Sequence, residues 1–332
     1  MNSRPWWVEI PSYSTLFNLN WQPTSATIKY DRLKLTPFKQ IVNHFEEHKE
    51  LSSKINLLNN LQTYCEENQR FLFDILPITF FLDLDHLEKF DSEFQDFLDC
   101  FQGKSSLFKS SIFSFSSHKL MQKSMDKKHY LYSQPRNYAT LNAGNNVWIL
   151  KPADYNRGRG IRLFNNLESL QSILLEYERY EFDNYKVIDV SNILKKRSFT
   201  FGKKANSTMK ILRKPLQNKE EMKKNTLKIL GNSKLKTRRF IIQKYIENPL
   251  LITQRKFDIR VWALLNHDLN IYFFKEGYIR TSSEVFNLYG NELENPFIHL
   301  TNNAIQKNSE KYGTFEKGNQ LSFYQLDVKN LN

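Results

Sequence analysis

The stretch WILKPADYNRGRGIRLF, residues 148–164, decides the fold. An apolar segment leads to Lys151, an arginine–glycine loop follows, and a second apolar segment closes the stretch. Glycine lets backbone N–H groups approach phosphate oxygens closely, and arginine adds charge-assisted hydrogen bonds to the same anion. We therefore expect two strands whose connecting loop covers a polyphosphate, as in a nucleotide-using enzyme. Taken alone, the loop could equally be an ordinary exposed turn or a nucleic-acid contact.

The composition indicates a folded protein of the cell interior. Its 332 residues allow two or three domains, and a hydrophobic content of 40%, with 14% aromatic residues, allows sizeable cores. Cys65 and Cys100 have neither metal-ligand spacing nor a disulfide framework, which favours a reducing compartment such as the cytoplasm. The longest mostly apolar run, residues 75–82, is too short to span a bilayer, and residues 1–12 lack the apolar core of a signal peptide. We expect neither secretion nor membrane insertion.

The positive charge is concentrated in one segment. The net charge is +13, and residues 186–239 hold 17 lysines and arginines against three acidic residues, so the rest of the chain is nearly neutral. This segment is expected to be a solvated, partly disordered insertion that attracts an acidic partner. A low-complexity loop without a partner is an equal alternative. RNA binding is disfavoured, because no aromatic stacking motif accompanies the charges.

Hydrophobic periodicity predicts a helix near the N-terminal end. Within residues 51–73, apolar side chains recur every three or four positions, at Ile55, Leu58, Leu61 and Cys65, as in an amphipathic core helix. Lys54 stands near its beginning, beside Ser52 and Ser53 as candidate N-caps. A lysine at that end of a helix could face an anion.

Strands are expected in the second half. They are predicted over 147–150, over 160–164 and in the segment RRFIIQKY, with a helix over 167–180 and loop mixed with short helix over 90–146. Residues 256–280 predict two antiparallel strands joined at His267 and Asp268, followed by a third short element.

Charged residues gather at the ends of these strands. Because alternate residues of a strand share a face, Lys256, Asp258 and Arg260 are expected on one side. In a pocket, Lys256 would contact an anion, Asp258 a ribose or metal, and Arg260 a phosphate. A surface ladder of opposite charges is the alternative.

Five motifs in fixed order resemble the tubulin tyrosine ligase-like family, which has the ATP-grasp fold. They are KPADYNRGRGI (151–161), IIQKYIENPLL (241–251), RKFDIRVWALL (255–265), YIRTSSE (278–284) and HLTNNAIQK (299–307). The stretch NHFEEHKELSSKINLLNNL, from residue 43, resembles the family's N-terminal region.

The resemblance implies an α/β fold of two lobes around a nucleotide cleft. Residues 1–52 would form an N-terminal domain, 53–245 the central lobe with the basic insertion, and 246–332 the C-terminal lobe. The implied reaction is ATP-dependent amide formation between an amino acid and a protein carboxylate, through an acyl phosphate.

The resemblance also implies a role for each matching residue. Lys54 and Lys151 would contact phosphates under a loop made of Arg157, Gly158, Arg159, Gly160 and Ile161. Adenine would be read by Gln243, Lys244, Tyr245 and Ile246, and the nucleoside would lie at Lys256, Phe257 and Asp258. Arg260 would contact the γ-phosphate and the acyl phosphate. Arg280, Thr301 and Asn302 would hold the carboxylate and acceptor side.

The closest branch by resemblance is the glycine-adding one, with glutamate addition as the alternative. The implied partners are acidic tubulin tails and free glycine or glutamate, on the cytoskeleton and in a cilium or axoneme. The family's Mg²⁺ ligands lie on two strands beyond the HLTN motif, an Asp strand and a Glu-x-Asn strand. Neither is found before Asn332, and Asp327 lacks the surrounding apolar strand, so no metal ligand is assigned. We expect a truncated C-terminal lobe, or else an inactive relative that binds nucleotide or tubulin.

Overall fold

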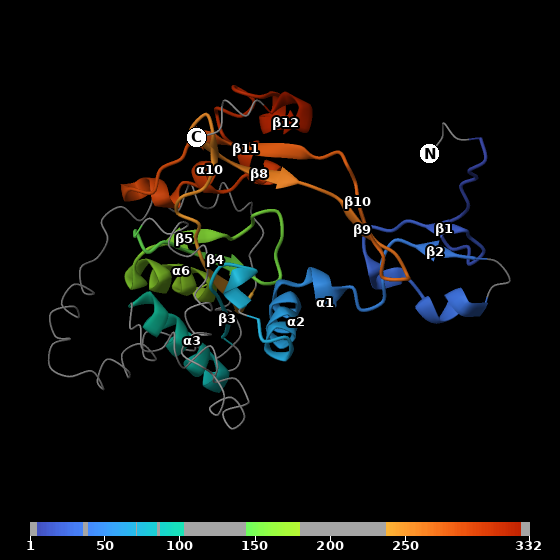
Figure 1. Cartoon of the computed structure of the whole chain (residues 1–332), viewed down its shortest axis with the longest axis horizontal. Helices are drawn as coiled ribbons and strands as arrows, with labels where there is room; N and C mark the ends of the chain where they lie inside the picture. Colours follow the sequence, from blue (N-terminus) through green and yellow to red (C-terminus); the bar gives the residue numbers. More distant parts are fainter. Residues whose placement is uncertain are drawn as a thin grey trace. The chain divides into compact units, whose positions relative to one another are not determined.

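The structure, a computed structural model, describes residues 5–35, 39–70, 72–84, 87–102, 144–179 and 237–326 (Figure 1). The basic insertion up to residue 236, the serine-rich stretch after residue 102 and Asp327 lie outside the described residues. The chain divides into two compact units, Met1–Tyr64 and Cys65–Asn332. Helices and sheets are mixed, as predicted.

The first unit contains a two-stranded parallel sheet and short helices. β1 (Leu19–Asn20) pairs with β2 (Ile41–Val42). The helical elements are η1 (Ser25–Thr27), η2 (Tyr30–Leu35), α1 (Lys49–Ser52) and the start of α2 (Lys54–Glu67).

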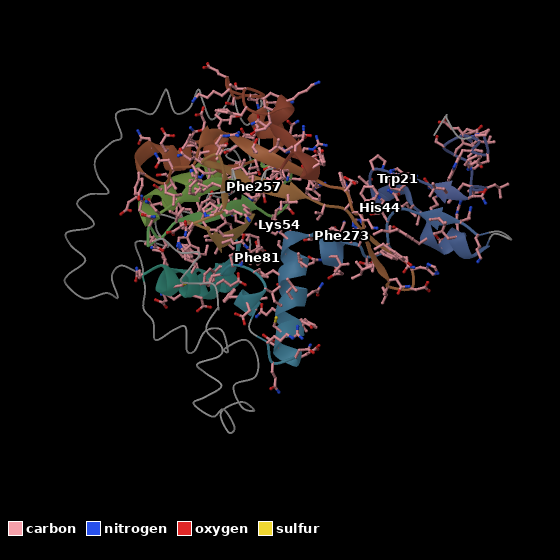
Figure 2. All side chains as sticks on the ribbon, turned by 45° about the horizontal axis from the view of Figure 1, so that its top comes forward. Trp21, His44, Lys54, Phe81, Phe257 and Phe273 are labelled. Carbon is pink, nitrogen blue, oxygen red and sulfur yellow. The ribbon has the colours of Figure 1, made fainter. Side chains whose placement is uncertain are left out.

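Helix α2 confirms the helix predicted within residues 51–73. Its apolar stripe lies inward: Leu58 and Cys65 are buried. The hydroxyl of Ser53 accepts a hydrogen bond from the backbone N–H of Asn56 at 3.4 Å, which confirms Ser53 as the N-cap. Lys54 is the first residue of this helix (Figure 2).

The first sheet of the second unit is antiparallel and has the order β3-β6-β4-β5. Its strands are β3 (Thr79–Asp83), β6 (Arg239–Lys244), β4 (Trp148–Pro152) and β5 (Arg162–Phe164). Helices α3 (Leu87–Phe101) and α6 (Leu167–Arg179) share one core with this sheet, in which Trp148, Leu150 and Phe240 are buried. The predicted strands around residue 148, residue 162 and residue 240, and the helix over 167–180, are confirmed.

Helix α3 corrects the prediction of loop and short helix after residue 90. It is 15 residues long, and Phe94 and Phe97 are buried in its core. The ring of Phe97 packs edge-on against Trp148, with centroids 5.2 Å apart. Phe94, Phe97 and Phe101 follow the spacing of one helical face, a signal that the many polar neighbours obscured.

The second sheet has the order β12-β11-β8-β7. Its strands are β7 (Leu251–Ile252), β8 (Arg255–Arg260), β11 (Tyr278–Val285) and β12 (Gln320–Ser322), and β9 (Ala263–Leu265) and β10 (Ile271–Phe273) form a separate hairpin. Short helical elements complete the unit: η3 (Leu72–Asp74), η5 (Gly290–Glu294), α10 (Pro296–His299), α11 (Asn303–Gln306), η6 (Lys317–Asn319) and η7 (Phe323–Gln325).

Strand β8 corrects the predicted pairing of residues 256–280. The turn at His267 and Asp268 is confirmed, but β8 ends at Arg260 and pairs with the eight-residue β11. Asp258 lies directly opposite Arg280 in this register. Opposite charges that face each other across two strands stabilise this pairing of β8 with β11.

A second core joins the first sheet to the segment that follows β11. On the face of the first sheet away from α3 and α6, Ile149 and Tyr245 pack in one cluster with Leu293, Leu300 and Ile305. This packing brings the HLTN motif to the first sheet. Among the helices of the described ranges, none has both the length and the apolar character needed to cross a bilayer.

Candidate functional site

A row of polar side chains crosses the first sheet. The Nζ of Lys151 on β4 donates to the Oε1 of Gln243 on β6 at 2.6 Å. The Nε2 of Gln243 donates in turn to the Oγ1 of Thr79 on β3 at 2.8 Å. Strand alternation sets these side chains on the face opposite α3 and α6. The structure thus brings together two residues predicted for one site and adds Thr79.

Lys244 points the other way. Its Nζ donates to the backbone oxygen of Val147 at 2.9 Å, pairs with the carboxylate of Glu247 and lies 5.5 Å from the centre of the Trp148 ring. Glu247 also accepts hydrogen bonds from the backbone N–H groups of Val147 and Asn145, so this pair joins the end of β6 to the start of β4. Only the backbone of Lys244 is left for a ligand on the Lys151 side.

An ordered hydrogen-bond chain begins at Lys256. Its Nζ donates to the hydroxyl of Tyr245 and to the backbone oxygen of His299, both at 2.9 Å. The Nε2 of His299 lies 3.0 Å from the backbone carbonyl oxygen of Glu292. Because a carbonyl oxygen can only accept a hydrogen bond, Nε2 carries the proton. The Nδ1 of His299 therefore accepts from Tyr245 at 3.1 Å. His299 was not predicted as a site residue, although its motif was.

The electrostatics around Lys256 suit an anion. Burial, and then the charge of Lys151, lower the pKa of Lys256 to about 8. Burial, and then the charge of Lys256, lower the pKa of His299 to about 4, so the imidazole is neutral near pH 7. Two lysines that disfavour each other's charge would both be stabilised by a polyphosphate between them.

Asp258 is the centre of a second group. It accepts two hydrogen bonds from the guanidinium of Arg280, at 2.7 and 2.5 Å, and one from the hydroxyl of Thr301 at 2.9 Å. The hydrogen bonds that Arg280 donates to Asp258 are the largest cause of the raised pKa of Arg280. Three predicted site residues from three motifs therefore meet here. Arg260, two positions along the same face of β8, is exposed.

The arginine–glycine loop reaches the HLTN motif. Arg157, Gly158 and Gly160 have φ angles of 59°, 79° and 70°, in the left-handed region. A Cβ on Gly158 would lie 2.8 Å from the Oδ1 of Asn302 and 3.1 Å from the Cγ1 of Ile305. Only glycine allows this approach, so the first and last motifs touch.

Two further predicted residues lie at the start of α2 and on β8. Lys54 belongs to the first unit. Phe257 alternates with Lys256 and Asp258, so its side chain lies on the opposite face of β8, opposite Thr281 in the register with β11. Ile246, just past β6, is 39% exposed.

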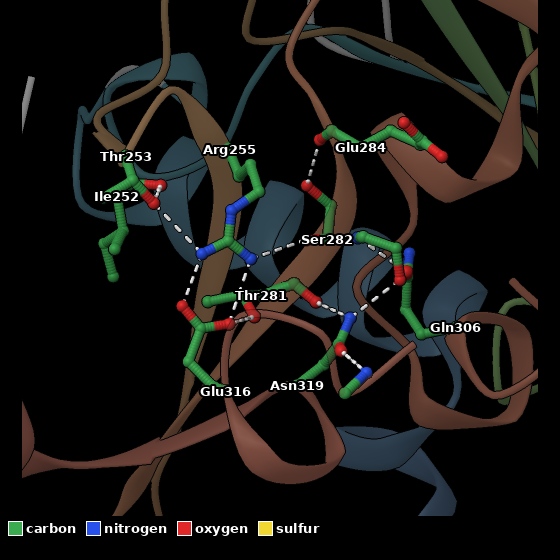
Figure 3. A network of polar contacts seen from close by, with 11 residues as sticks. Ile252, Thr253, Arg255, Thr281, Ser282, Glu284, Gln306, Glu316 and Asn319 are labelled. Atoms are coloured by element: carbon green, nitrogen blue, oxygen red, sulfur yellow. Dashed lines mark hydrogen bonds and ion pairs between the residues drawn. The ribbon is translucent and has the colours of Figure 1, made fainter. Parts of the chain in front are cut away.

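A buried ion pair supports the back of the second sheet (Figure 3). Arg255, 1% exposed, binds both carboxylate oxygens of Glu316, and it also donates to the oxygen of Ser282 at 3.1 Å and to the hydroxyl of Thr253 at 3.0 Å. The hydroxyl of Thr281 donates to Glu316 at 2.8 Å. Sequence reasoning missed this pair, and its one signal is an arginine that directly precedes the Lys-Phe-Asp motif.

Gln306 connects this network to the HLTN motif. Its Oε1 accepts from the backbone N–H of Ser283 on β11 at 2.8 Å (Figure 3). Its Nε2 donates to the backbone oxygen of Leu300 at 2.6 Å. Leu300 directly precedes Thr301. The Gln306 amide therefore fixes the position from which Thr301 reaches Asp258.

The described residues do not form a metal centre. Within the described ranges, no three His, Cys, Asp or Glu side chains come close enough to hold a metal ion together. The carboxylate nearest to the site chemistry, Asp258, is engaged by Arg280 and Thr301.

Comparison with known proteins gives one family and several relatives. The sequence model described as "Tubulin-tyrosine ligase family" matches residues 32–332. Tubulin glycylase 3D of Tetrahymena thermophila is 26% identical over 408 residues, covering 97% of the chain and 37% of the relative. Tubulin glycylase 3B of the same organism is 30% identical over 234 residues, covering 70% of the chain and 13% of the relative. A third relative from Tetrahymena thermophila, named probable alpha-tubulin polyglutamylase Ttll1, is 28% identical over 289 residues. The match covers 82% of the chain and 47% of the relative. The chain thus spans less than half the length of each.

Proposed function

Because the chain belongs to the tubulin-tyrosine ligase family, we propose that it is an ATP-dependent ligase that adds glycine to carboxylates of tubulin tails. The observation that carries this proposal is the convergence of Lys151, Lys256, Asp258, Arg280 and Thr301, from four separate motifs, beside the arginine–glycine loop. Two of the relatives described above are named tubulin glycylases, which supports glycine. The polyglutamylase relative supports glutamate as the alternative.

The site would bind ATP through the first sheet and β8. Lys151 and Lys256 would contact the phosphates, and the loop over residues 157–161 would cover them with backbone N–H groups. The segment Gln243–Ile246 would face adenine. Tyr245 and His299 orient the Lys256 ammonium, which keeps one N–H for a phosphate oxygen after two protein contacts.

The proposed reaction has two balanced steps. An oxygen of the acceptor carboxylate attacks the γ-phosphorus, the bond to ADP breaks, and an acyl phosphate forms. The amino-acid nitrogen then attacks the acyl carbon, phosphate leaves, and the nitrogen loses a proton. Arg260 and Arg280 would stabilise the phosphate and carboxylate charges, and Thr301 and Asn302 would position the acceptor.

Mg²⁺ is expected with ATP in this family, but the described residues do not fit it. They offer no cluster of three metal-binding side chains, so no step is derived through the metal. The acceptor would be found on the cytoskeleton, in the cytoplasm and in a cilium or axoneme. A second candidate function is nucleotide or tubulin binding without ligation.

Labelled glycine and glutamate test the proposal directly. The chain, tubulin, ATP and Mg²⁺ are incubated with each amino acid in turn, beside the variant Asp258→Asn, which keeps the side-chain shape and removes the charge that holds Arg280. Incorporation of glycine that Asp258→Asn loses supports the proposed activity. Incorporation of glutamate alone selects the alternative amino acid. ATP binding without any incorporation selects the binding function.

The affinity for ATP is expected to fall above pH 8. The pKa of Lys256, about 8, is below the ordinary value near 10.4, so the folded protein loses this proton first. Between these values the unfolded chain holds more protons, so this group's contribution to the free energy of unfolding rises with pH, while the charge that attracts phosphate is lost. Calorimetric titration at pH 7 and pH 9 should give about 10-fold weaker binding at pH 9. The variant Lys256→Arg, which stays charged, should flatten the profile. An unchanged wild-type affinity would contradict the assignment.

The basic insertion is expected to contribute to microtubule binding. Replacing its lysines from Lys195 to Lys236 with glutamine removes most of the charge that would attract acidic tails. Co-sedimentation with microtubules should weaken at low ionic strength and change little at high salt, because screening already removes the attraction there. Equal binding at low salt would leave the insertion without this role.

A further inference from the structure

The loop over residues 157–161 needs support to hold its conformation. Three of its residues have positive φ angles, and one of them, Arg157, is not a glycine. Such backbone conformations persist only where surrounding contacts hold them. Among backbone groups, Arg159 N–H donates to Asn156 at 3.2 Å and Ile161 N–H donates to Gly158 at 3.3 Å. Both bonds are local, because they join residues within 156–161 to one another.

A buried tyrosine supplies one contact from outside the loop. Tyr177 is the last member of a stripe on α6 that includes Leu170, Ile173 and Leu174, all of them buried. Its ring packs edge-on against Phe240, with centroids 4.8 Å apart, and its hydroxyl donates to the backbone oxygen of Gly160 at 2.5 Å. Burial raises the pKa of this hydroxyl, so it keeps its proton and stays a donor near neutral pH.

Two further contacts hold the same loop. Gly158 rests against Asn302 and Ile305, as described above. The guanidinium of Arg159 donates to the Oδ1 of Asn156 at 3.1 Å and lies 5.4 Å from the centre of the Tyr155 ring. The loop is therefore fixed at one end by α6 and in the middle by the HLTN motif.

We propose that Tyr177 is a positioning residue that holds the arginine–glycine loop in its ligand-covering conformation before any nucleotide binds. The proposal rests on the proposed function only for what the loop covers. Its consequence is that nucleotide binding requires little ordering of the loop, because the protein core has already fixed it. Tyr177 contacts no ligand itself and acts through the Gly160 carbonyl.

Hydrogen exchange of the full chain, without nucleotide, tests the proposal. The variant Tyr177→Phe keeps the ring and removes only the hydroxyl. The peptide spanning residues 153–164 should exchange about 2- to 10-fold faster, the range expected for one lost hydrogen bond. Peptides from β4 and β6 should be unchanged. The control Tyr324→Phe, at a residue that is 98% exposed, should match the wild type. Unchanged exchange of the loop in Tyr177→Phe would overturn the proposal.

A second variant and a second measurement separate this proposal from the function. Gly158→Ala disturbs the loop at its other contact and should also speed exchange over residues 153–164. Affinity for ATP is then measured for all variants. If the wild type binds ATP and Tyr177→Phe binds it several-fold more weakly, both proposals are supported. If the wild type binds no ATP but the loop still loosens in Tyr177→Phe, the function fails and the role of Tyr177 stands.

Discussion

Replacing Glu316 with alanine is expected to lower the free energy of unfolding by about 3–5 kcal/mol, the usual loss when one partner of a buried ion pair is removed. Arg255 is 1% exposed and would keep its charge in the interior without an anion. Thr281 would lose its hydrogen-bond acceptor in the same change. Chemical denaturation followed by circular dichroism measures the loss.

A neighbouring ion pair provides the matched control. Lys311 and Glu284 form a pair with side chains that are 56% and 26% exposed, so Glu284→Ala should cost less than about 1 kcal/mol. The double variant Arg255→Met with Glu316→Leu should recover much of the stability, because no unpaired charge is left buried. A loss from Glu316→Ala as small as that from Glu284→Ala would contradict the role given to the buried pair.

Replacing Lys256 with methionine is expected to reduce ligation about 100-fold or more, the range seen when one preorganised charge-stabilising donor is removed from an enclosed site. Methionine has a similar length and no charge, so the phosphates lose an ammonium that Tyr245 and His299 hold in place. Steady-state incorporation of labelled amino acid into tubulin measures the effect.

The fold should tolerate this change, which keeps the result interpretable. Burial already disfavours the charged form of Lys256, so removing the ammonium also removes a cost to the folded state. Lys275→Met, at an exposed position near the β9–β10 hairpin, serves as the control for loss of one positive charge. Full activity in Lys256→Met would exclude Lys256 from the chemistry.

The sequence predicted elements and shared faces better than it predicted partners. Apolar alternation is enough to place Lys256, Asp258 and Arg260 on one face of β8, because it depends only on neighbours in the chain. The same rule excludes Phe257 from that face, which motif matching alone did not reveal. Helix α3 was missed because the many polar residues around it obscured the helical spacing of its phenylalanines, which are three and four positions apart.

Contacts between distant segments could not be predicted, because they depend on strand register and on turns. Arg255 and Glu316 are 61 residues apart, and Tyr245 and His299 are 54 residues apart. A shift of β8 by one residue would turn Asp258 away from Arg280, and it would move Lys256 to the opposite face of the sheet. Only the folded arrangement shows that Tyr177 reaches Gly160 or that Gly158 meets Asn302.

The hydrogen-bond chain from Lys256 through Tyr245 and His299 to the backbone carbonyl of Glu292 can have its hydrogens in only one direction near neutral pH. The Glu292 carbonyl cannot give a proton, so every bond turns its hydrogen away from Lys256 and presents an oxygen lone pair to the ammonium. Protonation of His299, whose pKa is about 4, would reverse the hydroxyl of Tyr245 and aim its hydrogen at a positive charge. Below about pH 4, acid would therefore weaken the contact between Lys256 and Tyr245, although the lysine itself is already fully charged there.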